Sequence, residues 1–175
     1  MSVTIKFPPN FKTLPGALEK IAKRFKGMEA EIGVWDNGGA NVYARKKGKG
    51  IVYKVSTATN AQKAFWNCKG VPEKNIPPRD YQTQTITNNK RKWSDKAEKL
   101  LKNKKLSEFD ILEKIAIMAK DDTKRTIEAG NFPKNKTDTI IAKRGKDTPL
   151  IDSGDLIRSI AFQILDKNGR ILTQG

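Results

Sequence analysis

The sequence predicts an α+β fold, in which a small antiparallel sheet carries packed helices and a long helical segment lies in the middle of the chain. Two observations lead to this prediction. Apolar and polar residues alternate near both ends of the chain, as they do in half-buried strands. Between about 81 and 130 the apolar residues instead follow the spacing of amphipathic helices. We therefore expect a single domain over 1–175 with a helical arm at about 81–130.

The first third of the chain is predicted to supply most of the strands. Alternation predicts strands at 3–7, 30–34 and 51–55, and a helix is expected over 14–25. The stretch 45–50 is rich in lysine and glycine, so we expect an exposed connection there. The strands at 30–34 and 51–55 would then form a hairpin-like pair joined by a long loop.

The middle of the chain is predicted to be helical. Helices are expected over 57–66, from 81 to about 102, and from Ser107 to Gly130. Thr57 or Thr59 is the expected N-cap of the first helix, and Ser107 is expected to cap the third. The third is the most strongly predicted helix of the chain, because its apolar residues form a helical stripe at Phe109, Leu112, Ile115, Ala116, Ala119 and Ile127.

The C-terminal segment is predicted to return to strands. Short helical turns are expected at 137–143 and 153–159, before an alternating apolar run that starts at Ile160. The turn at 166–169 ends in Asn-Gly, a pair that favours tight hairpin turns. One or two terminal strands are therefore expected around this turn.

The composition restricts the chemistry that the chain can perform. Histidine is absent and Cys68 is the single cysteine, which excludes zinc sites of the Cys/His type and an intrachain disulfide. Lys and Arg number 35 against 19 Asp and Glu, a formal net charge of +16 that favours nucleic acid or an acidic protein surface as a partner. The N-terminus lacks the apolar region of a signal peptide, and no segment has the length of a membrane span. We expect a protein that is made and assembled in a cytoplasm and has no membrane partner.

The residues with catalytic potential do not form a recognisable constellation. Asp121 and Asp122 are adjacent on a predicted helix and point in different directions, so a solvated face that balances nearby lysines is the favoured interpretation. Cys68 has no histidine to activate it, and a packed thiol is favoured. Trp93 lies among basic residues but fits the apolar stripe, so a core or interface position is favoured over base stacking. We expect no enzymatic activity, no metal and no cofactor.

Two motifs carry a resemblance to a known family. The first runs over 59–70 and ends after a loop in Ile-Pro-Pro-Arg-Asp-Tyr at 76–81. The second comprises Thr-Ile at 139–140, a Lys-Arg-Gly-Lys turn at 143–146 and Pro-Leu-Ile-Asp-Ser-Gly-Asp-Leu-Ile-Arg-Ser-Ile at 149–160. In order and spacing this pattern resembles the tail-completion (neck) proteins of tailed bacteriophages, a virion-morphogenesis family. The resemblance covers roughly residues 15 to 166.

The resemblance implies a structural virion protein at the head–tail junction, acting in tail completion, in the neck or as a tail terminator. Family members commonly form homo-oligomeric rings, most often sixfold, that are coaxial with the DNA channel. The implied partners are further copies of the chain, head-connector or adaptor proteins, and tail-tube or tail-terminator proteins. The net charge of +16 suits such a ring, because a strongly positive channel would tolerate or guide DNA through non-specific contact. The implied location is the virion, after assembly in the host cytoplasm.

The motif residues have either an interface role or a purely fold-determining one. Pro77 and Pro78 are expected to stiffen the loop, and Arg79 offers a planar set of donors for a carboxylate or for carbonyls. Asp152 is expected to accept backbone hydrogen bonds from the turn that follows it, with Gly154 at positive φ. The full set is Trp66, Ile76, Pro77, Pro78, Arg79, Tyr81, Leu150, Asp152, Gly154 and Leu156.

Three basic segments are candidates to face DNA or an acidic partner. They lie in the connection at 45–49, on the helix at 90–105 and in the turn at 143–146. The candidate residues are Arg45, Lys46, Lys47, Lys90, Arg91, Lys92, Lys143 and Arg144. The alternative to a virion role is a basic nucleic-acid-binding module, whose affinity would fall steeply with salt.

Overall fold

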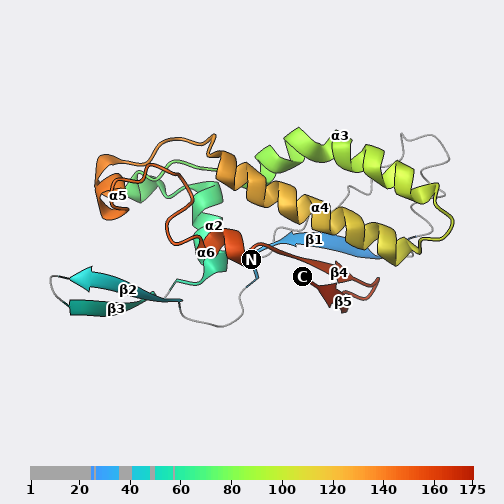
Figure 1. Cartoon of the computed structure of the whole chain (residues 1–175), viewed down its shortest axis with the longest axis horizontal. Coiled ribbons are helices and arrows are strands. Elements are labelled where there is room, and N and C mark those ends of the chain that lie inside the picture. The colour runs from blue at the N-terminus through green and yellow to red at the C-terminus, as the bar shows by residue number, and fades with distance from the viewer. Residues whose placement is uncertain (1–24, 26, 36–40, 48–49, 57) are drawn as a thin grey trace. The chain divides into compact units, whose positions relative to one another are not determined.

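The computed structural model describes a subset of the chain, and two compact units can be recognised within it. The described residues are 25, 27–35, 41–47, 50–56 and 58–175, with the backbone alone over 41–47 and 50–56. One unit, here called the helix–sheet unit, comprises the described part of Ser2–Gly33 together with Tyr81–Ala129 and Ile160–Gly175. The other, here called the motif unit, comprises the described part of Val34–Asp80 together with Gly130–Ser159. The helices and strands confirm the α+β fold class (Figure 1).

The sheet of the helix–sheet unit joins segments from opposite ends of the sequence. Its three antiparallel strands are β1 (Glu29–Gly33), β4 (Ala161–Leu165) and β5 (Ile171–Gln174), in the order β1-β4-β5. In register, Ile32 lies opposite Phe162, and both side chains are buried. The predicted turn before β5 is confirmed, because the Asp166 carboxylate accepts hydrogen bonds from two backbone N–H groups of the turn.

Two long helices follow in this unit, α3 (Tyr81–Leu101) and α4 (Glu108–Ala129). α4 packs against β1 and β4 of the sheet, and α3 packs against α4. Ser107 caps α4 as predicted: its hydroxyl accepts from the Asp110 N–H, while the Asp110 carboxylate accepts from the Ser107 N–H. The predicted stripe of α4 is buried at Leu112, Ile115, Ala116, Ala119 and Ile127. No helix among the described residues is both long and apolar enough to cross a membrane.

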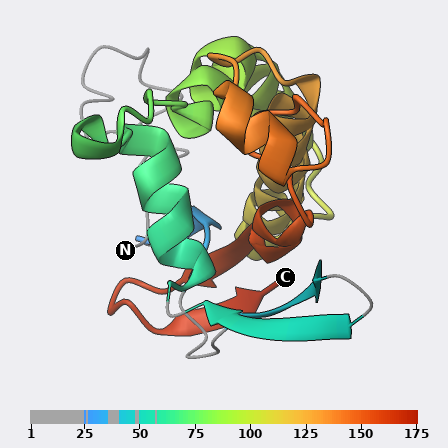
Figure 2. The same cartoon turned by 90° about the vertical axis from the view of Figure 1, so that its left-hand side faces the viewer.

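The motif unit is built from shorter elements. They are β2 (Asn41–Lys47), β3 (Gly50–Ser56), α2 (Asn60–Lys69), the 3-10 turn η2 (Pro72–Lys74), α5 (Thr137–Ala142) and α6 (Asp155–Ser159). Figure 2 shows α2 and the β2–β3 pair facing the viewer. Thr59 caps α2 as one of the two predicted alternatives, in a reciprocal capping box with Gln62. α2 and α6 contact each other, so a helix from each sequence motif meets in this unit.

The predicted pairing of strands is wrong. β3 pairs with β2 and not with β1, and β1 pairs with β4, more than 120 positions away in sequence. The stretch 45–50 was expected to be an exposed connection, but β2 continues to Lys47 and Lys47 lies opposite Gly50. β2 precedes β3 directly in the sequence, so pairing these two strands closes a shorter loop than pairing β1 with β3 and loses less chain entropy. The strand predicted at 3–7 and nearly all of the helix predicted over 14–25 lie outside the described residues.

A buried carboxylate joins α3 to α4, which contradicts the solvated position predicted for it. Asp122 is 4% exposed. Lys92 Nζ donates to both of its carboxylate oxygens at 2.7 Å, and Trp93 Nε1 donates to Oδ2 at 2.8 Å. Trp93 is itself buried, which confirms the core position favoured for it. Burial raises the pKa of Asp122, but the hydrogen bonds from Lys92 and Trp93 and the charge of Arg125 outweigh it, so the net pKa lies below the usual value.

A second buried polar pair lies within the sheet. Glu31 and Gln163 face each other in the β1–β4 register, and each is 7% exposed. The Gln163 amide donates to the Glu31 carboxylate at 2.6 Å. This directional contact favours the observed register, because a one-residue slip of β1 against β4 would turn Glu31 to the face opposite Gln163 and break the hydrogen bond.

We predict that Asp122→Asn destabilises the protein by about 1–3 kcal/mol at pH 7, because Lys92 and Trp93 lose a charged acceptor. The folded-state pKa of Asp122 is lowered, so its stabilisation is complete above the ordinary Asp pKa of about 4 and is lost as pH falls below it. Urea unfolding at pH 7 and at pH 3 measures both effects. The difference between wild type and variant should narrow at pH 3, whereas Asp121→Asn, one position away, should leave stability nearly unchanged. A difference that stays constant with pH would contradict this account.

Candidate functional site

Arg79 connects the end of the first motif to a segment that precedes the second. Its side chain is 7% exposed. Nε donates to the Pro133 carbonyl at 2.9 Å, and Nη2 donates to the Lys134 carbonyl at 3.0 Å and to Asn135 Oδ1 at 3.3 Å. The sequence predicted either a carboxylate or carbonyls as acceptors for Arg79, and the three acceptors in the structure are carbonyl oxygens. Burial lowers the pKa of Arg79 and Asp147 raises it, but a guanidinium stays charged at neutral pH.

The backbone around Arg79 is held by the end of α2. The Arg79 N–H donates to the Asn67 carbonyl at 2.7 Å, and Val71 and Ile76 exchange two backbone hydrogen bonds across the intervening turn. Gly70 has φ +74°, and a Cβ there would lie 2.7 Å from the Ile76 carbonyl oxygen. Only glycine fits this position, since any side chain would be both strained and in collision with backbone. The segment of prolines that follows therefore leaves α2 along one fixed path.

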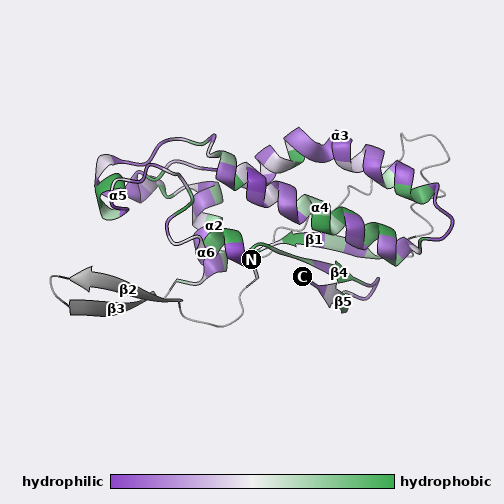
Figure 3. Cartoon of the chain, viewed as in Figure 1, coloured by the Kyte–Doolittle hydropathy of each residue, from purple (hydrophilic) through white to green (hydrophobic). Residues whose placement is uncertain are grey.

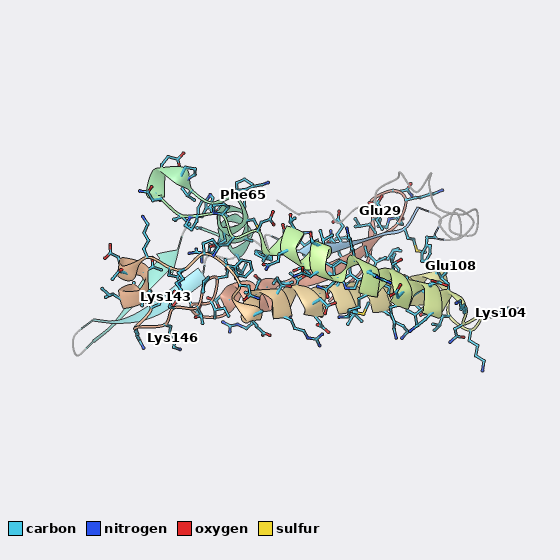
Figure 4. All side chains as sticks on the ribbon, turned by 90° about the horizontal axis from the view of Figure 1, so that it is seen from above. Glu29, Phe65, Lys104, Glu108, Lys143 and Lys146 are labelled. Carbon is cyan, nitrogen blue, oxygen red and sulfur yellow. The ribbon has the colours of Figure 1, made fainter. Side chains whose placement is uncertain are left out.

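The second motif is tied to the same segment. The Asn135 N–H donates to the Asp147 carboxylate at 3.2 Å, and Lys143 Nζ donates to the Thr148 carbonyl. Burial lowers the pKa of Lys143, and nearby Arg79 lowers it further, while Asp152 and Asp147 act in the opposite direction. Lys143 and Lys146 are both labelled in Figure 4, at the turn after α5. Residues 133–135 thus bond both to Arg79 and, through Asn135, to Asp147 of the segment that carries the second motif.

The turn before α6 is held by a different residue from the one predicted, because Asp152 was expected to accept its hydrogen bonds. Gly154 has φ +82°, as expected, and Leu150 also adopts a positive φ of 65°. Asp152 is exposed, and within the described residues its carboxylate accepts no hydrogen bond. Arg158 closes the turn instead, donating to the Ser153 carbonyl at 2.9 Å and to the Asp155 carboxylate. A guanidinium spans this turn more effectively than a short carboxylate because it offers several donors in one plane.

The structure separates buried from exposed motif residues. Arg79, Tyr81 and Leu156 are buried, which indicates a role in the fold, and Tyr81 belongs to the helix–sheet unit. Ile76, Pro77, Leu150 and Gly154 are half-buried, whereas Pro78, Asp152 and Trp66 are exposed. Trp66, on α2, has 44% of its surface exposed beside Phe65 at 39%. These two aromatic side chains are therefore free to contact another molecule, and Figure 4 labels Phe65 on α2.

The basic candidates are distributed over both units. Lys90 and Arg91 are exposed on α3, but Lys92 is 47% exposed and paired with Asp122. Lys143 is half-buried and Arg144 is exposed. The remaining three, Arg45, Lys46 and Lys47, lie in β2, where the structure describes the backbone alone.

The described residues hold few features suited to small-molecule chemistry. Among them, no group of three or more Cys, Asp or Glu side chains is arranged to bind a metal ion, and Cys68 is a buried thiol outside any disulfide. A cavity in the helix–sheet unit has about 10 Å³ of accessible space, enough for one water molecule. Its lining consists of Ile32, Gly33, Tyr81, Gln82, Thr123 and Ile160. Comparison of the chain with family models, with curated proteins and with solved structures gives no match.

We predict that Arg79→Ala lowers the stability of the protein by about 1–3 kcal/mol, because three acceptors lose their donors. Arg79→Lys should restore little of this loss, since an ammonium group does not reproduce the planar fork. Urea unfolding measures both variants, and hydrogen exchange at 133–135 should report local loosening. Lys134→Ala is the matched control, because it removes an exposed side chain and keeps the carbonyl that Arg79 binds. Equal stability of the Arg79→Ala variant and wild type would refute the proposed role.

Proposed function

We propose that this chain is a structural virion protein of a tailed bacteriophage, placed at the head–tail junction as a tail-completion, neck or tail-terminator subunit. In this role it forms a ring with further copies of itself, between the head connector and the tail, around the DNA channel. The observation that supports the proposal is the meeting of the two motifs in one unit. Arg79 bonds to 133–135, and α2 contacts α6, although the motifs are separated by more than fifty positions.

The mechanism is assembly and needs no chemical step. Rings of this kind join by docking preformed surfaces, with loops that adjust on contact. Exposed aromatic side chains are enriched at the centres of protein interfaces, and α2 presents Phe65 and Trp66. A net charge of +16 per chain gives such a ring a strongly positive potential, which suits the passage of DNA through its centre.

We predict that silencing the gene during phage growth leaves DNA-filled heads beside separate tails, or tails of abnormal length. Electron microscopy of the lysate distinguishes the two, because the first indicates joining and the second indicates termination. Supplying the wild-type chain from a plasmid should restore joined particles. Joined particles of normal length without the chain would refute the proposal.

The same assay tests the exposed aromatic side chain of the first motif. Trp66→Ala removes a candidate hot spot worth about 2 kcal/mol of binding, so joined particles should fall by more than about tenfold. Lys74→Ala, an exposed change in the neighbouring turn, should restore joining fully. Thermal unfolding of both purified variants separates a loss of contact from a loss of fold. Full restoration by Trp66→Ala would exclude Trp66 from the interface.

A further inference from the structure

The end of α3 and the connection after it concentrate positive charge. Residues 90–105 contain eight Lys or Arg and two acidic residues, Asp95 and Glu98. Figure 3 shows α3 as predominantly hydrophilic along its length, in contrast to the apolar stripe of α4. Lys104 lies at the tip of the connection between the two helices (Figure 4).

Among the residues that the structure describes, two of these eight basic residues form ion pairs. Lys92 is held by the buried Asp122, and Lys102 Nζ lies 3.1 Å from the Glu98 carboxylate. The other six are exposed, and none forms an ion pair with any carboxylate in the described part of the chain. We call these six the cationic strip: Lys90, Arg91, Lys96, Lys99, Lys104 and Lys105.

The strip stands on a rigid support. Trp93 and Lys92 fix α3 to Asp122 of α4, so the first four members of the strip are carried by an anchored helix. At about 1.5 Å rise per residue, Lys90 to Lys99 span about 14 Å. A DNA duplex presents about eight phosphates over that length.

The composition of the strip favours phosphate over protein as its partner. Neither aromatic residue of α3, Tyr81 or Trp93, is available to stack on bases, because both are buried. No large apolar side chain among residues 90–105 is exposed, although the centre of a protein–protein interface is usually apolar. Lysine ammonium groups act on phosphate as point charges and carry no sequence information.

We propose that the cationic strip binds the phosphate backbone of duplex DNA without regard to sequence. The strip excludes Lys92, which the sequence had placed among the DNA-facing residues, because Asp122 neutralises it. The inference depends on the charges of α3 and its connection, so it stands or falls separately from the proposed position at the head–tail junction.

The test is the salt dependence of binding to a mixed-sequence 30-base-pair duplex, followed by fluorescence anisotropy from about 50 to 200 mM salt. The strip variant carries Lys96→Gln, Lys99→Gln, Lys104→Gln and Lys105→Gln. Four lost phosphate contacts reduce the log–log salt slope by about 3.6. Wild-type affinity should therefore fall about 150-fold more than variant affinity over this range.

Two further variants make the result specific. The control carries Lys69→Gln, Lys74→Gln, Lys134→Gln and Lys136→Gln, four exposed lysines of the motif unit outside the other basic segments, and loses the same charge. It should keep the wild-type slope. Arginine at the four strip positions should also keep the slope, which attributes the loss in the glutamine variant to charge and not to the lysine side chain itself.

Three outcomes would overturn the inference. An equal loss of slope in the control would mean that total charge, and not the strip, governs binding. A strip variant that binds DNA like wild type would show that the strip makes no phosphate contact. Loss of binding to a polyglutamate peptide with unchanged DNA binding would assign the strip to an acidic protein surface.

Discussion

The guanidinium of Arg79 bonds to three oxygen atoms that lie 54 to 56 positions further along the chain. Burying a charged group costs free energy unless its hydrogen-bond donors are satisfied. The burial of Arg79 therefore favours the conformation of the loop at 133–135 in which the loop's carbonyl oxygens accept from the guanidinium. That loop in turn supports the second motif through Asp147. The position of both motifs within the motif unit therefore depends on one side chain and on the glycine turn that directs it.

The helix–sheet unit uses a buried charge of the opposite sign for the same purpose. Asp122 accepts from Lys92 and Trp93, and this joins α3 to α4, as Arg79 joins the first motif to the loop at 133–135. The contact has a consequence for the surface, because it pairs one lysine with a carboxylate and holds the helix that carries four of the six residues of the cationic strip. Packing and surface electrostatics are linked through this single carboxylate.

The features that the sequence predicted correctly are local ones. The caps at Thr59 and Ser107 and the Asp166 turn depend on contacts within four positions, and each was predicted from the residue types alone. The pairing of β1 with β4 and the burial of Asp122 depend on residues far apart in sequence. From the sequence alone, a carboxylate that neighbours lysines on a helix is expected to be exposed to solvent. The burial of Asp122 depends on donors from another helix, which the local sequence does not reveal. For Arg79 the donor was predicted, but its acceptors at 133–135 lie outside both motifs and carry no sequence signal.

The central claim is that this chain is a component of the head–tail junction of a virion. It is tested most directly by quantitative mass spectrometry of purified phage particles after heads and tails have been separated from their joining region. The account predicts the chain at the joining region in a fixed small number of copies per particle, consistent with one ring. Its absence from purified particles, or copies scattered through heads and tails alike, would contradict the account.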